Sequence, residues 1–330
     1  MIIQAHLQTQ DPNAMPTPLS AKLAHRLEGQ CALPQLGILQ AQGEDAAQFL
    51  HNQLTQDVLL LPVGQARLAA FCNAKGRMQA SFVLVKTAPE TVLLVLPLDL
   101  MAQTRQRLSM FVLRAKVRLS DVTDEWQRVG LLGASARALL GDAAPWQVCN
   151  LGNAHAVALY PAVLGDTHVP RGFWLAPSGQ VLPDAALVDA SLWSWATVLS
   201  GVPFVTQPLF EAFVPQMLNF ESVGGVNFKK GCYPGQEVVA RSQFRGTLKR
   251  RMALLHSPVP LVAGQELFNP ADPEQPCATV VQCAPRPDGE GFDALASGTT
   301  ESLQTGWHAG TAQGPQLQLM PLPYPLLEDL

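Results

Sequence analysis

The chain has 330 residues, of which 48% are hydrophobic and only 15% are charged, a composition that excludes a disordered chain and predicts a large buried core in two or three domains. The formal net charge of −4 is mild and argues against bulk nucleic-acid binding. The most apolar run, Val92–Leu98, is too short to span a bilayer. The first residues lack a basic segment followed by an apolar core, so we expect a cytoplasmic protein with no membrane partner.

Residues 1–30 are polar and contain proline, and they predict a lead-in arm. Residues 31–125 predict a first α+β lobe, in which helical spacing of apolar side chains indicates helices at Asp45–Leu54 and Leu98–Leu113. The expected strands of this lobe are Leu36–Ala41, Arg67–Asn73, Met78–Lys86, Thr91–Leu96 and Ala115–Ser120. Their order resembles a β-α-β-β-α-β layer unit, with a hairpin turn around Ala74–Gly76.

Residues 126–250 predict a second α+β lobe. Its expected strands are Arg128–Leu132, His155–Tyr160 and Phe173–Leu175. Its expected helices are Ser135–Leu140 and Pro183–Leu199. Residues 251–330 contain short strand-like pieces separated by turns rich in proline and glycine. This texture predicts a small antiparallel β-barrel.

A cysteine motif stands out near the end of the second lobe, where Lys229–Arg241 reads K-K-G-C-Y-P-G-Q-E-V-V-A-R. Pro234-Gly235 suits a turn, and a helix is expected to begin just after it, with an acid in its first turn. Cys232 would then lie near a helix N-terminus and two lysines, which favours the thiolate. A buried structural cysteine is the alternative, but lysines, glycines and a Gln-Glu pair are poor core material. We interpret Cys232 as the working thiol, and the other motif residues are Lys229, Lys230, Gly231, Tyr233, Gly235, Gln236, Glu237 and Arg241.

Basic residues cluster around this motif, seven of them against one acid between residues 229 and 251. They are Lys229, Lys230, Arg241, Arg245, Lys249, Arg250 and Arg251. The cluster predicts either a region that attracts anions or an ordinary solvated face. The six cysteines are scattered without a C-x-x-C pair, so we expect no intrinsic zinc or iron–sulfur site, and this usage suits a reducing compartment.

The string K-G-C-Y-x-G-Q-E-x-V-A-R at Lys230–Arg241 resembles the signature of the YgfZ family of folate-binding proteins, which are related to the glycine-cleavage T-protein and to mitochondrial iron–sulfur assembly factors. Further matches follow in order along the chain, at Gly43–Val58, Phe71–Arg77, Pro215–Phe228 and Leu322–Leu326. The resemblance implies an α+β fold, with a two-lobed folate-binding body and a C-terminal antiparallel β-barrel around a central opening. It also implies tetrahydrofolate as the cofactor.

The resemblance also suggests which residues meet folate. A tryptophan at the place of Trp193 is implicated in folate contact, and the hairpin turn adds Asn73, Lys75 and Arg77 as candidates, with an ordinary charged turn as the alternative. Trp193 and Trp195 cannot share one helix face, so one of them is expected to face a cavity. Two departures from the relatives bear on the affinity for folate. Ser200 stands where the relatives have a glutamate, and Leu36 stands where some relatives have an aromatic residue.

The T-protein places aspartates after this hairpin, one of which serves aminomethyl transfer. The aligned residues are Met78, Gln79, Ala80 and Ser81, and none of them supplies a carboxylate. The sequence therefore predicts a chain that is not a working aminomethyltransferase.

Three functions remain open. The leading hypothesis is a folate-binding accessory protein that supports iron–sulfur cluster assembly or repair, and hence tRNA modification, with iron–sulfur enzymes or assembly proteins as partners. In it, Cys232 acts in thiol exchange or a transient cluster contact. The alternatives are a folate-dependent one-carbon transferase with a relocated acid or base, and a module that binds an anionic partner such as tRNA through Lys229–Arg251.

Overall fold

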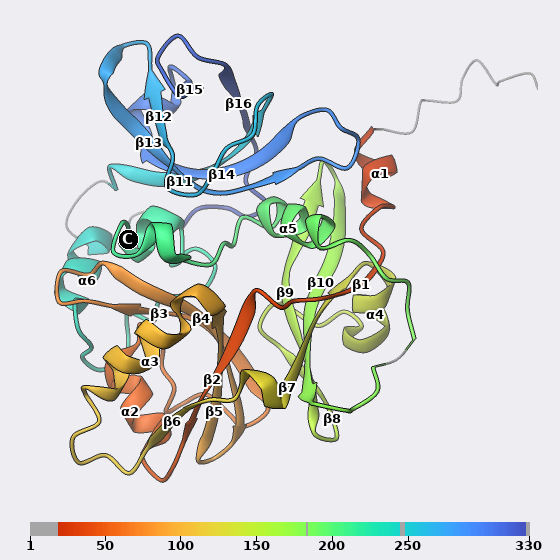
Figure 1. Cartoon of the computed structure of the whole chain (residues 1–330). Helices are drawn as coiled ribbons and strands as arrows, with labels where there is room; N and C mark the ends of the chain where they lie inside the picture. The colour runs from red at the N-terminus through yellow and green to blue at the C-terminus, as the bar shows by residue number, and fades with distance from the viewer. Residues whose placement is uncertain (1–18, 183, 245–247, 328–330) are drawn as a thin grey trace, which may run out of the picture.

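The computed structural model describes residues 19–182, 184–244 and 248–327. Residues 1–18 of the predicted arm, the predicted helix start at Pro183, and Arg245 of the basic cluster lie outside these ranges. Two antiparallel five-stranded sheets with helices form the body, and a closed six-stranded antiparallel barrel follows (Figure 1). The predicted α+β fold with a C-terminal barrel is confirmed.

The first sheet has the order β3-β4-β5-β2-β6. Its strands are β2 (Leu36–Gln42), β3 (Gln65–Cys72), β4 (Met78–Ala88), β5 (Thr91–Pro97) and β6 (Arg118–Asp121), and its helices are α2 (Ala46–Gln53), η1 (Leu98–Leu100) and α3 (Met101–Ser109). Both faces of this sheet are buried. Side chains of β5 alternate, so that Val92, Leu94 and Leu96 pack beneath α2 and α3, whereas Leu93 and Val95 face the central core.

The second sheet has the order β1-β7-β10-β9-β8. Its elements are β1 (Gly29–Ala32), β7 (Trp126–Leu132), β8 (Val148–Leu151), β9 (Ala154–Leu164), β10 (Thr167–Pro177), α1 (Leu19–Ala24), η2 (Thr123–Glu125) and α4 (Ala134–Leu140). The strand β1 pairs antiparallel with β7, far along the chain.

Helix α5 (Ala190–Leu199) begins later than its predicted start at Pro183. The Asp189 carboxylate accepts a hydrogen bond from the Ser191 N–H at 2.8 Å and caps the helix. The Val188 N–H donates to the Gln30 carbonyl at 2.9 Å, which ties the preceding segment to β1. The predicted start was wrong because these two partners, one of them distant in sequence, fix the boundary.

The barrel has the order β11-β14-β13-β12-β15-β16. Its elements are β11 (Arg250–Ser257), β12 (Glu266–Asn269), β13 (Asp272–Pro285), β14 (Phe292–Thr299), α7 (Thr300–Leu303), β15 (Trp307–Ala309) and β16 (Gln316–Met320). Between α5 and the barrel the chain forms η3 (Gln207–Leu209), η4 (Pro215–Leu218) and α6 (Gln236–Phe244). None of the helices in the described ranges is long and apolar enough to cross a membrane.

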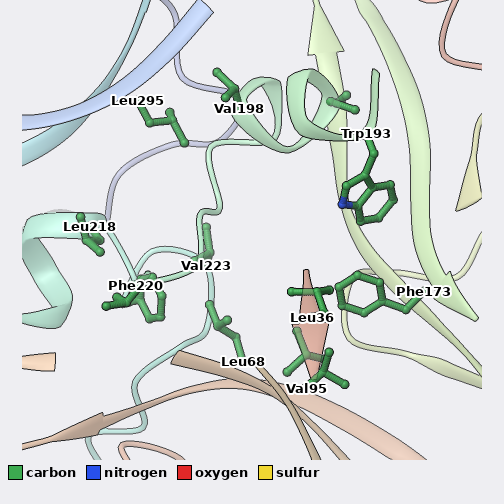
Figure 2. Packing of buried hydrophobic residues seen from close by; sticks show 14 of the residues in the cluster. Leu36, Leu68, Val95, Phe173, Trp193, Val198, Leu218, Phe220, Val223 and Leu295 are labelled. Atoms are coloured by element: carbon green, nitrogen blue, oxygen red, sulfur yellow. The ribbon is translucent and has the colours of Figure 1, made fainter. Parts of the chain in front are cut away.

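Helix α5 lies between the second sheet and the barrel (Figure 1). Trp195 is fully buried, and its Nε1 donates a hydrogen bond of 2.7 Å to the carboxylate of Asp293 on β14. Trp193, two residues earlier, points instead toward Phe173 and Leu36 (Figure 2). The helix thus joins the barrel through one tryptophan and faces the body with the other.

Candidate functional site

A cavity of about 720 Å³ lies where the two sheets, α5 and the barrel meet. Its walls include Leu36, Leu68 and Val83 from the first sheet, Tyr160, Arg171 and Phe173 from the second, Trp193 and Thr197 from α5, and Leu261 and Val281 from the barrel side. Most of these side chains are apolar or aromatic. Such a cavity suits a small ligand with a flat apolar part and few polar groups.

Trp193 and Phe173 form an aromatic wall of this cavity. Their ring centroids are 5.6 Å apart, and Phe173 stacks on Phe204 with a centroid distance of 6.4 Å. Gly130 on β7 makes room for the indole, since a Cβ there would lie 2.5 Å from Trp193 Cε3. Leu36, the aliphatic replacement noted in the sequence, lines the same cavity. Trp193 is only 4% exposed, so the part of a ligand that contacts its indole is shielded from water.

Arg171 is a functional candidate that the sequence reasoning missed. It lies on β10, is only 4% exposed and lines the cavity. Its guanidinium is 4.6 Å from the centroid of the Trp193 ring, and burial lowers the pKa of Arg171 to about 9. A single arginine inside the apolar run Val169–Ala176 is the signal that could have found it.

Cys232 is exposed, and of the six cysteines it alone is exposed. Helix α6 begins just after it at Gln236, with Glu237 in the first turn, as predicted. Burial raises the pKa of Cys31 to about 11 and that of Cys72 to about 12, which keeps those two thiols protonated near neutral pH. Among the cysteines, Cys232 is therefore the one placed to meet another molecule.

Lys230 also has a structural role that its sequence position did not indicate. Its ammonium is buried and donates to the carbonyls of His51 and Leu54, the latter at 2.8 Å, at the end of α2. It also lies 4.7 Å from the ring centroid of the buried Tyr233, and burial lowers the pKa of Lys230 to about 8. Lys230 anchors the cysteine motif to the first lobe, whereas Lys229 remains exposed.

The hairpin turn between β3 and β4 packs against the cysteine motif. Asn73 Oδ1 accepts hydrogen bonds from the N–H groups of Lys75 (2.9 Å) and Arg77 (3.0 Å), so this side chain closes the turn. Gly235 has φ +80°, and a Cβ there would lie 2.7 Å from the Cα of Gly76. The structure thus brings the three turn candidates to the motif of Cys232, while Trp193 lines the cavity.

Gln79 and Ser81, which follow the hairpin turn on β4, are held by hydrogen bonds. Gln79 Nε2 donates to Glu211 Oε1 at 2.6 Å, and Ser81 Oγ accepts from the Val205 N–H at 2.8 Å. The bond from Gln79 lowers the pKa of Glu211, whose backbone has φ +59°. A carboxylate from a later segment therefore lies beside this hairpin.

The basic cluster is smaller on the surface than in the sequence. Arg251 is buried in an ion pair with Glu221, and Lys230 is buried as described. Lys229, Arg241 and Lys249 remain exposed. Within the described ranges, His, Cys, Asp and Glu side chains form no group of three or more that could hold a metal ion.

The two antiparallel sheets and the terminal barrel define an aminomethyltransferase-like fold. The crystal structure of glycine cleavage system aminomethyltransferase T from Bartonella henselae superposes with a TM-score of 0.70 over 94% of this chain and 90% of that chain, at 16% identity. Residues 29–156 match the family model described as GCVT N-terminal domain.

Sequence relatives narrow this class. An uncharacterized protein from Haemophilus influenzae is 31% identical over 222 residues, which cover 67% of this chain and 71% of the relative. Proteins named tRNA-modifying protein YgfZ from Edwardsiella ictaluri and Colwellia psychrerythraea are 30% and 29% identical. These matches cover 64% of this chain and 65% of the first relative, and 68% of this chain and 70% of the second. The chain belongs to the YgfZ family.

Proposed function

We propose that this chain is a cytoplasmic folate-binding accessory protein that supports iron–sulfur cluster assembly or repair, and through it tRNA modification. The cavity lined by Trp193 is the single observation that carries the proposal. The names of the YgfZ relatives support its link to tRNA. Iron–sulfur enzymes or assembly proteins are the proposed partners.

Reduced folate fits the residues that line the cavity. The volume of about 720 Å³ lies within the range of sites for small ligands, about 300–1,000 Å³. Trp193 and Phe173 contribute aromatic side chains to the wall that a pterin ring would contact, and Leu36 adds an aliphatic side chain. When bound, tetrahydrofolate supplies a carrier for one-carbon groups. The chain itself orients the ring and excludes water from it.

The exposed thiol of Cys232 gives the protein a second working surface. Cys232 belongs to a loop that Lys230 anchors and that packs on the turn at Gly76. An exposed thiol on an anchored loop can meet a partner without rearrangement of the core. We propose that the cavity holds the folate and that Cys232 contacts the iron–sulfur partner by thiol exchange or by a transient cluster contact.

A one-carbon transferase is the second candidate, and the place of Glu211 favours it. Its carboxylate lies 2.6 Å from the Gln79 amide, beside the positions where the T-protein has aspartates. A carboxylate held ionised can accept a proton. Turnover of an aminomethylated carrier protein at about 1 per second or more, lost in Glu211→Gln, would place this function first.

Calorimetric titration with tetrahydrofolate tests the proposed function. We expect wild type to bind, and Trp193→Ala to weaken binding by about 1–3 kcal/mol, which is the range for loss of an aromatic stacking partner. Trp126→Phe is the matched control, because Trp126 stacks on His155 at a centroid distance of 6.1 Å and does not line the cavity. Equal affinity of wild type and Trp193→Ala, or no binding to wild type, would refute the proposed cavity.

A further inference from the structure

We propose that Arg171 is the polar recognition group of the central cavity, and that it donates hydrogen bonds to an oxygen acceptor of the bound ligand. This inference rests on the proposed ligand cavity and adds the chemistry that the cavity selects. The ligand would be a planar ring compound that carries a carbonyl or carboxylate oxygen. Such an oxygen supplies the further hydrogen-bond acceptor that the surroundings of Arg171 lack.

Among the described residues, no carboxylate pairs with the charge of Arg171. Nη2 donates to Thr197 Oγ1 at 2.6 Å and Nη1 to the Tyr160 carbonyl at 3.2 Å, and both acceptors are neutral. Among the described residues Arg171 forms no ion pair, and its buried Nε has no hydrogen-bond partner. Buried arginines are rare without a paired anion, because the desolvation of the charge is left uncompensated. This arrangement destabilises the free protein and favours a ligand that brings an acceptor.

The strand beside Arg171 is irregular. Val169 pairs with Ala162 and Arg171 with Leu159, so that β9 places two residues opposite the single residue Pro170. The extra residue belongs to β9, and bulges of this kind occur beside active sites. The Arg171 guanidinium, on β10, lines the cavity and lies against the Trp193 ring. Its planar fork of donors matches an oxygen at the edge of a ring that rests on the same aromatic wall.

Folate carries such oxygens in two places, namely the carbonyl of the pterin ring and the carboxylates of the glutamate tail. Because Arg171 lies 4.6 Å from the ring centroid of Trp193, an acceptor that reaches it belongs to the part of the ligand that meets this tryptophan. We therefore expect the ring carbonyl to be the partner. A probe with the ring alone and a probe with the tail alone distinguish the two sources.

The test compares wild type with Arg171→Met and Arg171→Lys. The matched control is Arg128→Met, because Arg128 is half-buried on the adjacent strand β7, donates to the carbonyls of Thr123 and Trp126, and does not line the cavity. Thermal unfolding is measured without ligand. Calorimetric titration then uses tetrahydrofolate, a tetrahydropterin without the tail, and p-aminobenzoylglutamate.

We expect Arg171→Met to unfold at or above the temperature of wild type, since an uncompensated buried charge is removed. The same variant should bind tetrahydrofolate and the ring probe at least about tenfold more weakly. Arg171→Lys, which keeps the charge without the planar fork, should recover part of the affinity. Arg128→Met should leave the affinity for tetrahydrofolate unchanged.

A loss of affinity confined to the tail probe and tetrahydrofolate would support Arg171 as the recognition group and assign the acceptor to the carboxylate. Unchanged affinity of Arg171→Met for every probe, or unfolding of this variant below wild type, would overturn the inference. Should wild type bind none of the probes, the proposed function fails. The recognition role given to Arg171 then fails with it, and the thermal comparison shows only whether the uncompensated charge destabilises the free protein.

Discussion

At the scale of single residues, surroundings decide what a side chain can do. Cys232 and Cys72 belong to segments that touch each other, yet Cys232 is exposed and Cys72 is buried. Lys229 and Lys230 are neighbours, and only Lys230 is buried. Two residues of the same type that lie close together can therefore differ, with one on the surface and the other in the core.

Replacement of Cys232 tests its proposed role in contacting an iron–sulfur partner. We expect Cys232→Ser to change the free energy of unfolding by less than about 0.5 kcal/mol, because the side chain is exposed. We also expect it to abolish cellular support of a cluster-dependent tRNA thiolation. Chemical denaturation and a complementation assay measure the two effects.

Cys72→Ser is the matched control for this thiol. It places a hydroxyl without a partner in the core and should cost about 1–3 kcal/mol. A Cys232→Ser variant that is stable and fully functional, or one that unfolds as readily as Cys72→Ser, would contradict the role given to Cys232.

Single residues also show how far sequence reasoning reaches. The turn at Pro234-Gly235 and the helix after it could be predicted, because turn and helix-start signals are local. The place of Lys230 could not, because its acceptors, the carbonyls of His51 and Leu54, lie far earlier in the chain. Arg171 was missed for the same reason, since its burial follows from the packing of β10 against α5.

At the scale of elements, most strands and helices follow from periodicity and turn residues, and their order along the chain was predicted. Their pairing was harder to predict. Strand β1 adds to the second sheet by pairing with β7, and no local pattern indicates this partner. The contact between the hairpin turn at Gly76 and the loop at Gly235 is likewise a product of the fold.

Gly235 should be essential to that contact. Gly235→Ala adds a methyl group 2.7 Å from the Cα of Gly76, at a backbone with φ +80°. Gly289→Ala is a matched control, because Gly289 also has φ +80° but has no atom within 4 Å of the added group. We expect Gly289→Ala to cost about 1–2 kcal/mol from the left-handed backbone alone, and Gly235→Ala to cost more. Equal losses in urea unfolding would show that the turn and the loop do not press on each other.

At the scale of the whole molecule, buried polar contacts fasten the barrel to the body. Arg251 at the start of β11 pairs with Glu221, and its Nη2 donates to the Leu327 carbonyl at 3.1 Å. Asn219 donates to the Met252 carbonyl at 3.0 Å. These bonds join the loop before α6, the barrel and the last described residues.

Removal of Glu221 should therefore weaken the whole assembly. Glu221→Ala leaves Arg251 buried without its counter-charge and should cost about 3–5 kcal/mol. Glu44→Ala, which breaks the exposed pair with Lys116, should cost at most about 1 kcal/mol. Denaturant unfolding followed by tryptophan fluorescence measures both. A small loss in Glu221→Ala would mean that this ion pair does not fasten the barrel to the body.

The cavity has walls from both sheets, from α5 and from the barrel side, so it exists only when these parts are docked together. A ligand that occupies it binds the assembled chain and not its separate parts, and by mass action it shifts the balance toward assembly. At a free concentration of about 100 times its dissociation constant, the gain is about 2.7 kcal/mol. The supply of the ligand would then govern how much folded protein a cell retains, apart from any chemistry in the cavity.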